Sequence, residues 1–439
     1  MLFTNRLLDP HPRRSLRRTL PQAAIALAML VAPASCSDET ASDPRGLPDA
    51  ALPPPEQDAS READASSDVR TDARRLTVEC SVEPCARDLS ASWSESFCAL
   101  LDDGRVACWG RNEAGHLGRD AGAWNATAQP VDDVASAIAL DRTCAVVSDG
   151  GLRCWGPAAA LSGEEGGVVQ VPLPSVSAVR SSEDIACAIA SGGSLSCWGR
   201  RGADGVLAFA DAGAEGALVP PTTVPLDGPV DDVTIASGRR AACSDCPVVS
   251  SNAVIARLAD GTMVSWGQAP LVGRTTSRLA DPEPTPLLTR GGSLSGGFGA
   301  CAVVDGRMSC WGHRHDDPGE PQPLPGVPSP TRAALGDFHY GRDAARFGRG
   351  CAVTAAGDVF CWGQNDFGQA GDGTTTLRSV PVKVEGLPER IVRVEVTRGT
   401  SCALGVSGRV HCWGDDGFGQ RGQKVPFTAD LRPLPVELP

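Results

Sequence analysis

Apolar and polar positions alternate in a phrase of about thirteen residues that recurs seven times, most clearly as CALLDDGRVACWG at residues 98–110. Each copy has an alternating run, a turn that contains Gly, a second alternating run and then Trp-Gly, which predicts a β-hairpin. The other copies span residues 144–156, 187–199, 255–267, 301–312, 351–363 and 402–414. Strand-rich units that repeat every roughly 40 to 70 residues are typical of closed arrays, so we predict a ring of seven blades.

Each unit holds four strand candidates from about residue 76 onward. In the second unit, residues 131–147 supply one strand that leads into the Cys strand, 151–156 the third and 168–173 the fourth. The abundance of turn residues, 50 Gly and 35 Pro, favours such short strands over helices. The Trp of each phrase is most simply the packed anchor of its blade; these are Trp109, Trp155, Trp198, Trp266, Trp311, Trp362 and Trp413.

Six of the seven phrases carry a pair of cysteines, and the fourth has Ile255 and Ser265 at both positions. Joint loss favours a partnership within each pair, and a spacing of ten around a turn sets the two residues opposite each other on neighbouring strands. Paired thiolates binding zinc are the alternative, but a hairpin supplies only two ligands. We therefore predict six disulfides: Cys98–Cys108, Cys144–Cys154, Cys187–Cys197, Cys301–Cys310, Cys351–Cys361 and Cys402–Cys412.

Five of the 17 cysteines lie outside the phrases. Cys80 and Cys85 are a local candidate pair, and Cys243 and Cys246 are another. The second pair has the spacing of a redox-active CxxC motif, but no helix is predicted after it, which favours a structural bridge. Cys36 is left without a partner.

The N-terminal 35 residues are typical of an export signal, with a basic region at residues 13–18 and a short apolar stretch at 23–31. The stretch is too short to span a bilayer as a helix. The segment resembles a bacterial lipoprotein signal, which implies acylation of Cys36, although Pro33 stands where that signal usually has Leu. An ordinary signal-peptidase site at residues 32–34 stays open, and would leave Cys36 as a free secreted thiol. Either route leads out of the cytoplasm, where disulfides persist.

Residues 36–75 are rich in Asp, Ala, Pro and Ser and lack aromatic residues. Such a segment buries too little apolar area to fold, so we predict a disordered tether. The formal charge of the chain is −13, and removal of residues 1–35, with five Arg and one Asp, leaves −17. An acidic surface repels phosphate backbones, so we do not expect nucleic acid as a partner.

The repeat CAL-x-DGRV-x-CWG, followed by N-x-x-G-Q-x-G, resembles that of the regulator of chromosome condensation family. This resemblance covers about 360 residues, 76–439, and implies an all-β, seven-bladed β-propeller with four-stranded blades around a central channel. The doubled Cys resembles the exported bacterial branch of the family. The sequence RPLPVELP at residues 432–439 matches a fourth-strand position, so the C-terminus is expected to complete the last blade.

The family resemblance does not transfer a function. The eukaryotic namesake promotes nucleotide exchange on a small GTPase and binds chromatin, and we find no residues here to carry over for either role. A secreted bacterial relative type inhibits β-lactamases through an aromatic-rich propeller face. A chain with one Tyr, Tyr340, and ten Phe gives poor support for such a face.

No nucleophile elbow, phosphate-binding loop or HExxH motif occurs in the sequence. The segment from His313 to Asp317 could bind a metal ion, but a solvated polar loop is the simpler interpretation. Asp132-Asp133 and Asp231-Asp232 occupy similar repeat positions and are interpreted as strand-edge charges. Residues 200–252 contain the longest insertion, a common place for recognition.

We therefore expect no catalytic, cofactor or metal site and a lipid-anchored propeller in the bacterial cell envelope, at the outer membrane or surface, that binds a protein or glycan through its loop faces. Secretion without an anchor is the alternative location. An exported enzyme with a site at the channel mouth and a secreted inhibitor are the alternative functions. Oligomeric state and ligand identity do not follow from the sequence.

Overall fold

The computed structural model describes residues 75–439 except 93, 164–166, 211–212, 242–247, 313–318, 337–348 and 424–430. These residues form seven four-stranded antiparallel sheets, and within each sheet the strands lie in chain order. This confirms the predicted all-β propeller with seven blades of four strands. Besides the strands, the described residues form only a short 3-10 turn, η1 (Glu113–Gly115), and one short helix, α1 (Gly156–Ala160). No described helix has the length and apolar character needed to cross a membrane.

The strands of the seven blades, in chain order, have the following bounds. They are β1 (Ala86–Ala91), β2 (Ser96–Leu101), β3 (Val106–Arg111), β4 (Trp124–Pro130); β5 (Ala137–Asp141), β6 (Cys144–Val147), β7 (Leu152–Trp155), β8 (Val168–Val171); β9 (Val176–Ser181), β10 (Ile185–Ala190), β11 (Leu195–Arg200), β12 (Leu218–Thr223); β13 (Val230–Ala241), β14 (Val248–Leu258), β15 (Thr262–Gln268), β16 (Ala280–Arg290); β17 (Ser293–Gly297), β18 (Gly299–Val304), β19 (Arg307–Trp311), β20 (Gln322–Pro323); β21 (Pro330–Gly336), β22 (Arg349–Thr354), β23 (Val359–Gly363), β24 (Arg378–Lys383); β25 (Ile391–Val396), β26 (Thr400–Gly405), β27 (Val410–Gly414) and β28 (Leu434–Pro435).

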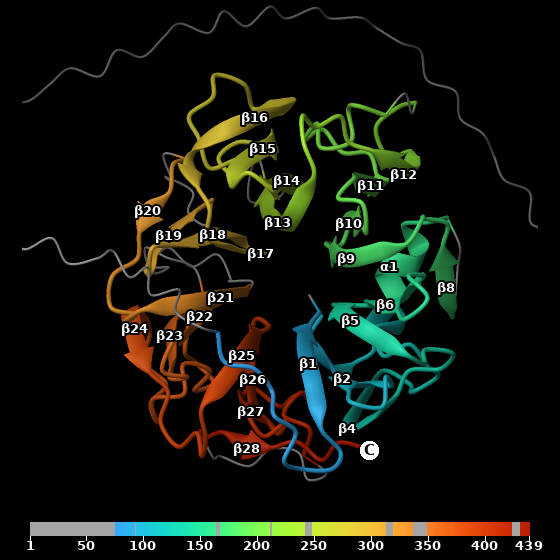
Figure 1. Cartoon of the computed structure of the whole chain (residues 1–439). Helices are drawn as coiled ribbons and strands as arrows, with labels where there is room; N and C mark the ends of the chain where they lie inside the picture. The colour runs from blue at the N-terminus through green and yellow to red at the C-terminus, as the bar shows by residue number, and fades with distance from the viewer. Residues whose placement is uncertain are drawn as a thin grey trace, which may run out of the picture. The chain divides into compact units, whose positions relative to one another are not determined.

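The first strand of every blade is the innermost one, and these seven strands surround the central channel (Figure 1). Each innermost strand contacts the innermost strands of both neighbouring blades, including β1 with β25, so the ring is closed. The C-terminal β28 pairs with β27, as the sequence predicts, and supplies the fourth strand of the last blade.

Within the described ranges, the first and last blades share no strand and are joined by side chains and by a short N-terminal strap, residues 75–85. The strap runs along the last blade, where the N–H groups of Glu79 and Ser81 donate to the carbonyls of Val406 and Ser407 at 2.8 and 3.1 Å. Val78 packs into the apolar cluster that joins the two blades. The strap therefore seals the seam between the ends of the chain.

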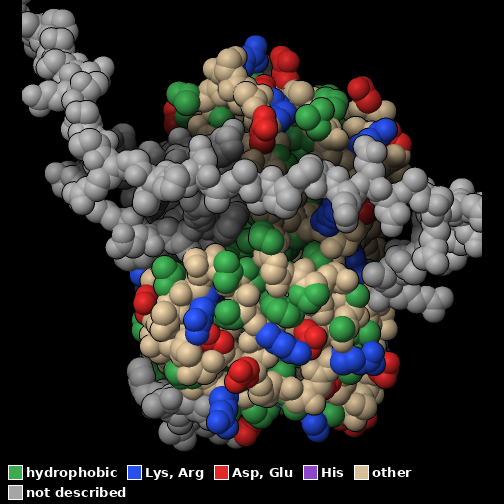
Figure 2. All heavy atoms as spheres, turned by 90° about the vertical axis from the view of Figure 1, so that its left-hand side faces the viewer, with side chains coloured by type: hydrophobic (Ala, Val, Ile, Leu, Met, Phe, Trp, Pro, Cys, Tyr) green, Lys and Arg blue, Asp and Glu red, His purple; other side chains and the backbone are tan. Residues whose placement is uncertain are grey.

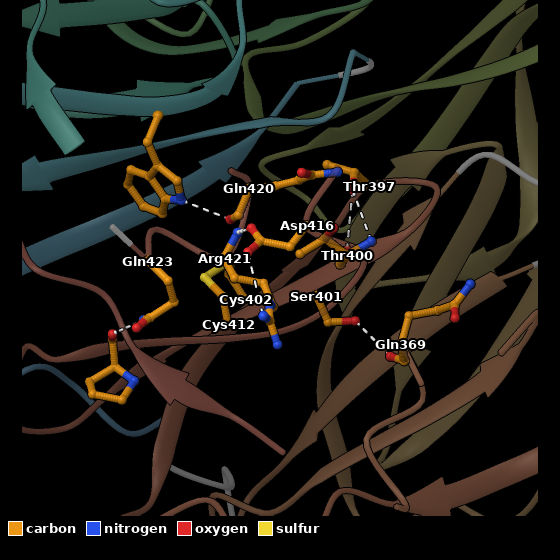
Figure 3. The surroundings of a disulfide bond; sticks show 12 residues. Gln369, Thr397, Thr400, Ser401, Cys402, Cys412, Asp416, Gln420, Arg421 and Gln423 are labelled. Atoms are coloured by element: carbon orange, nitrogen blue, oxygen red, sulfur yellow. Dashed lines mark hydrogen bonds and ion pairs between the residues drawn. A yellow bond between two sulfur atoms is a disulfide. The ribbon is translucent and has the colours of Figure 1, made fainter. Parts of the chain in front are cut away.

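The Trp side chains are the packed anchors that the sequence predicts, since all seven are at most 2% exposed. Five of the indole N–H groups donate to a backbone carbonyl in the preceding blade. The donors and acceptors are Trp109 to Gln420, Trp155 to His116, Trp266 to Val206, Trp311 to Leu271 and Trp413 to Gln369, at 2.8–3.0 Å (Figure 3 shows the Gln420 contact). The indole N–H of Trp198 has no such partner. Its preceding blade has α1 in place of the Gly-rich loop that presents the carbonyl.

The Gly of each Trp-Gly pair has a steric reason. Gly110 has a φ of +103°, and an added Cβ would lie 2.5 Å from the carbonyl oxygen of Glu95 on the neighbouring strand. Only Gly fits such a close approach of two backbones without strain.

The strand register places the two cysteines of each phrase directly opposite each other, for example Cys98 opposite Cys108 and Cys402 opposite Cys412. In all six phrases the two sulfurs are bonded and the Cα atoms lie 4.0–4.1 Å apart. Cys80 bonds Cys85 within the strap. Cys36, Cys243 and Cys246 lie outside the described residues.

One predicted element is wrong in its register. The tetrapeptide VDDV occurs at 131–134 and 230–233, but the two copies occupy different positions. Val131 follows β4 and bonds to the carbonyl of Val106, so Asp132 and Asp133 lie in the connection to the next blade. Asp231 and Asp232 lie within β13. Only the second pair, therefore, carries strand-edge charges.

Candidate functional site

The two faces of the ring differ strongly in the length of their connections. On one face, which we call the loop face, the third and fourth strands of each blade are joined by ten to nineteen residues. On the opposite face, the turn face, every connection has two to seven residues. Each internal gap in the described residues falls between two strands whose facing ends lie on the loop face. Every connection of ten or more residues therefore lies on the loop face, where recognition sites are commonly found on rigid scaffolds.

The insertion at residues 200–252 also belongs to this face. Part of it lengthens the connection before β12, and the rest extends β13 and β14 into a long hairpin, paired from Val230 and Leu258 to Ala241 and Val248. Blade six has a second long connection at the corresponding place, between Gly336 and Arg349.

Large apolar side chains stand exposed along the loop face. Trp124 and Leu218 are the first residues of the outermost strands β4 and β12, and Leu377 directly precedes β24; Trp124 is 45% exposed. Phe367, in the loop of blade six, is 50% exposed. At the seam, the guanidinium of Arg111 lies 4.7 Å from the ring centroid of Phe418, an arrangement that orders both side chains. By contrast, the outer side around β16, β20 and β24 shows basic, acidic and apolar side chains interspersed (Figure 2).

The central channel contains the second candidate site, a polar cavity of about 60 Å³ to which all seven innermost strands contribute. Four arginines line it: Arg142, Arg180, Arg332 and Arg393. The lining also contains Asp141 and Glu395 and the hydroxyl groups of Ser90, Ser181, Thr234 and Ser295. The described lining contains no His, so arginine, carboxylate and hydroxyl groups define its chemistry.

The carboxylates of the channel hold two of these arginines. Arg393 pairs with Asp88 across the seam, and its Nε donates to Glu395 at 2.7 Å. Arg180 lies 3.9 Å from both Asp141 and Asp232, which come from different blades. Asp141 in turn accepts the backbone N–H of Ser181 at 2.9 Å. These contacts join blade seven to blade one, and blade three to blades two and four, at the channel.

The charges leave an electrostatic imbalance at Arg332. The neighbouring Arg393 and then burial lower the pKa of Arg332 to about 10. Burial would lower the pKa of Arg393 as well, but Asp88 and Glu395 outweigh it and raise that pKa. Arg332 thus stays charged at neutral pH, beside a second cation whose carboxylates are already engaged.

Sequence reasoning did not find this cavity. Each innermost strand contributes only one or two polar residues to it, so no local motif marks the site. A weak signal did exist, since Asp88, Asp232, Arg332 and Arg393 each follow a bulge at the same position of their strand.

The sequence offered His313–Asp317 as a possible metal site. His313–Asp317 and Tyr340 lie outside the described residues. Among the residues that the structure does describe, no group of three His, Cys, Asp or Glu is placed to hold a metal ion.

A buried histidine makes a pH dependence predictable. Burial lowers the pKa of His116, which is only 7% exposed and whose carbonyl accepts the indole N–H of Trp155. A lowered folded-state pKa means that the unfolded chain binds the proton first, so stability is complete above about pH 6.5 and falls as the pH drops below it.

We expect the unfolding free energy to decrease from pH 7.5 to pH 5.5 in denaturant titrations, and His116→Gln to flatten this slope. His411 is a matched control, because burial lowers its pKa too. The substitution His411→Gln should leave the part of the pH dependence that comes from His116 unchanged. An unchanged slope in His116→Gln would show that His116 does not contribute.

A ring of seven four-stranded blades with Trp anchors and a polar channel defines a seven-bladed β-propeller. Models of the regulator of chromosome condensation (RCC1) repeat match residues 87–115, 333–369, 356–404 and 391–420. The chain thus carries RCC1 repeats in its first, sixth and seventh blades.

Known relatives match parts of the chain. Protein RCC2 homolog of Danio rerio is 36% identical over 86 residues, 19% of this chain and 17% of that protein. RCC1 domain-containing protein RUG3, mitochondrial, of Arabidopsis thaliana is 29% identical over 156 residues, 33% of this chain and 32% of that protein. The matches thus span no more than about a third of the length of either relative.

The fold resembles a solved structure of Prp20p from Saccharomyces cerevisiae, studied with its binding to Gsp1p and histones. The TM-score is 0.59 at 17% identity, over 84% of this chain and 88% of that one. A structure of Kap60 bound to yeast RCC1 (Prp20) matches with a TM-score of 0.57 at 15% identity, over 87% and 91%. At these identities the likeness concerns the fold.

Proposed function

We propose that this protein is a non-catalytic, exported propeller that binds a protein or glycan partner at the bacterial cell surface through its loop face, and that a lipid on Cys36 anchors it. The observation that carries the proposal is the contrast between the two faces, because every connection of ten or more residues lies on the loop face and those of the turn face have two to seven. A rigid scaffold whose long connections all lie on one face is suited to recognition there.

Two further observations support binding. The exposed Trp124 and Phe367 lie on the loop face, and aromatic side chains are enriched at the centres of protein interfaces. The similar propeller Prp20p binds proteins, Gsp1p and histones, which shows that this fold suits protein recognition.

The anchor is supported by the sequence alone, and the location by the sequence together with the bonded cysteines. A basic region, a short apolar stretch and a cysteine after small residues support export and acylation. The bonded cysteine pairs are consistent with a location outside the reducing cytosol, since disulfides persist there.

The proposal is tested by capture of cross-linked partners from the surface of intact cells. Trp124→Asp combined with Phe367→Asp should reduce partner recovery about tenfold or more, because desolvated aromatic anchors carry most of an interface's energy. Leu288→Asp is the matched control, since Leu288 is fully exposed near the turn-face end of β16. Equal recovery with all three proteins would refute a loop-face site.

A further inference from the structure

Four guanidinium groups from four different blades reach the channel cavity, and they differ in how they are neutralised. Arg393 has two carboxylate partners, Asp88 and Glu395. The guanidinium of Arg180 lies 3.9 Å from a carboxylate oxygen of Asp141 and 3.9 Å from one of Asp232.

The other two arginines differ from each other. Arg142 donates to the carbonyl of Ala91 at 3.3 Å. The guanidinium of Arg332 makes no hydrogen bond or ion pair within the part of the chain that the structure describes. The positive charge of Arg393 is the main reason for the lowered pKa of Arg332.

Hydroxyl groups in the same cavity are also left with protons to donate. The oxygen of Ser90 accepts the N–H of Arg142, and that of Ser295 accepts the N–H of Ala333 at 3.2 Å. A serine hydroxyl that accepts in this way can still donate one hydrogen bond. Both serines line the cavity, so they can donate toward the same space as Arg332.

The charge count indicates what would occupy this space. Four carboxylates lie near the four arginines: Asp88, Asp141, Asp232 and Glu395. Their ion pairs are with Arg393 and Arg180. The guanidinium of Arg332 has no carboxylate within 4 Å among the described residues. A doubly charged anion would be repelled by Asp141 and Glu395, which also line the cavity. A singly charged, planar oxyanion suits one guanidinium fork.

We propose that the channel cavity binds a single carboxylate group, held by Arg332 with the hydroxyls of Ser90 and Ser295. The carboxylate belongs either to a small organic acid or to an acidic side chain of a protein partner, which share this chemistry. The site does not include the loop-face apolar residues, so its test is independent of the test of the proposed function.

The test measures thermal unfolding of the full chain while acetate replaces chloride at constant ionic strength. We expect a saturable rise in melting temperature with acetate, as for any ligand that binds the folded state alone. Arg332→Gln should raise the dissociation constant about tenfold or more, because hydrogen bonds to charged groups are the strong ones. In acetate-free buffer the same variant should melt higher than the parent protein, because the repulsion from Arg393 is gone.

Arg290→Gln is the matched control, since the Arg290 side chain is 65% exposed on an outermost strand and should leave the acetate response unchanged. Arg332→Lys keeps the charge without the planar fork, and should bind acetate more weakly than the parent protein. A short peptide amide with one Glu distinguishes the sources: saturation by acetate indicates a free acid, and saturation by the peptide alone indicates a partner's side chain. No saturable response to either probe, or an equal response in Arg332→Gln, would overturn the proposal.

Discussion

Reduction of the disulfides is expected to cost this propeller more free energy of unfolding than any single substitution. Each of the six hairpin bridges closes a loop of about eleven residues and should stabilise the fold by about 2–3 kcal/mol. A typical domain has only about 5–15 kcal/mol of net stability, so the loss of all six would unfold the ring. The expected result is a cooperative transition in buffer with reductant, at a temperature where the oxidised protein stays folded.

The measurement combines calorimetry with intact mass under non-reducing conditions, which reports bridged cysteines and any acyl group on Cys36 together. Free thiols at Cys98, Cys108, Cys351 and Cys361 in protein taken from cells would contradict both the bridges and the exported location.

Blade four supplies a built-in comparison. Ile255 and Ser265 face each other in the register that the other blades use for cysteines, and both are completely buried. The double substitution Ile255→Cys and Ser265→Cys should add a seventh hairpin bridge worth about 2–3 kcal/mol. The gain is reduced by the lost contact of Arg274 with the Ser265 hydroxyl at 3.3 Å.

The blades could be predicted from the sequence because their determinants are local. A hairpin such as residues 98–110 needs only a period of two, a Gly turn and a terminal Trp-Gly, all of which lie within thirteen residues. The opposed cysteines follow from the same spacing. Register at the blade boundaries was harder, because VDDV ends blade one and begins blade four with identical letters. The two copies of VDDV differ in their place in the fold: residues 131–134 follow the fourth strand of blade one, whereas residues 230–233 lie in the first strand of blade four.

The channel and the seam could not be predicted because they join residues from distant parts of the chain. Asp88 and Arg393 are paired although 305 positions separate them. The strap pairs with the last blade through backbone groups, which any sequence supplies, so no residue type marks it. Sequence periodicity defines the blades, whereas their assembly into a ring defines the sites.

The seam should be the most sensitive junction of the ring, and Trp109→Ala is expected to lower the unfolding free energy by about 3–5 kcal/mol through lost packing alone. Trp109 is completely buried in the cluster shared by the first and last blades, and its indole donates to the carbonyl of Gln420 at 2.9 Å. The substitution leaves that buried carbonyl without its partner, which costs about 1–3 kcal/mol more.

Trp198→Ala is the matched control because Trp198 is equally buried, its indole N–H has no partner, and its blade is joined to both neighbours by the chain itself. Denaturant titration should therefore show a smaller loss for Trp198→Ala, by about 1 kcal/mol or more. Hydrogen exchange should rise in β1 and β26 for Trp109→Ala, since no shared strand holds those blades together when their side chains no longer pack. Equal losses, with exchange rising evenly around the ring, would mean that the strap and the channel ion pair of Asp88 with Arg393 are sufficient to hold the seam.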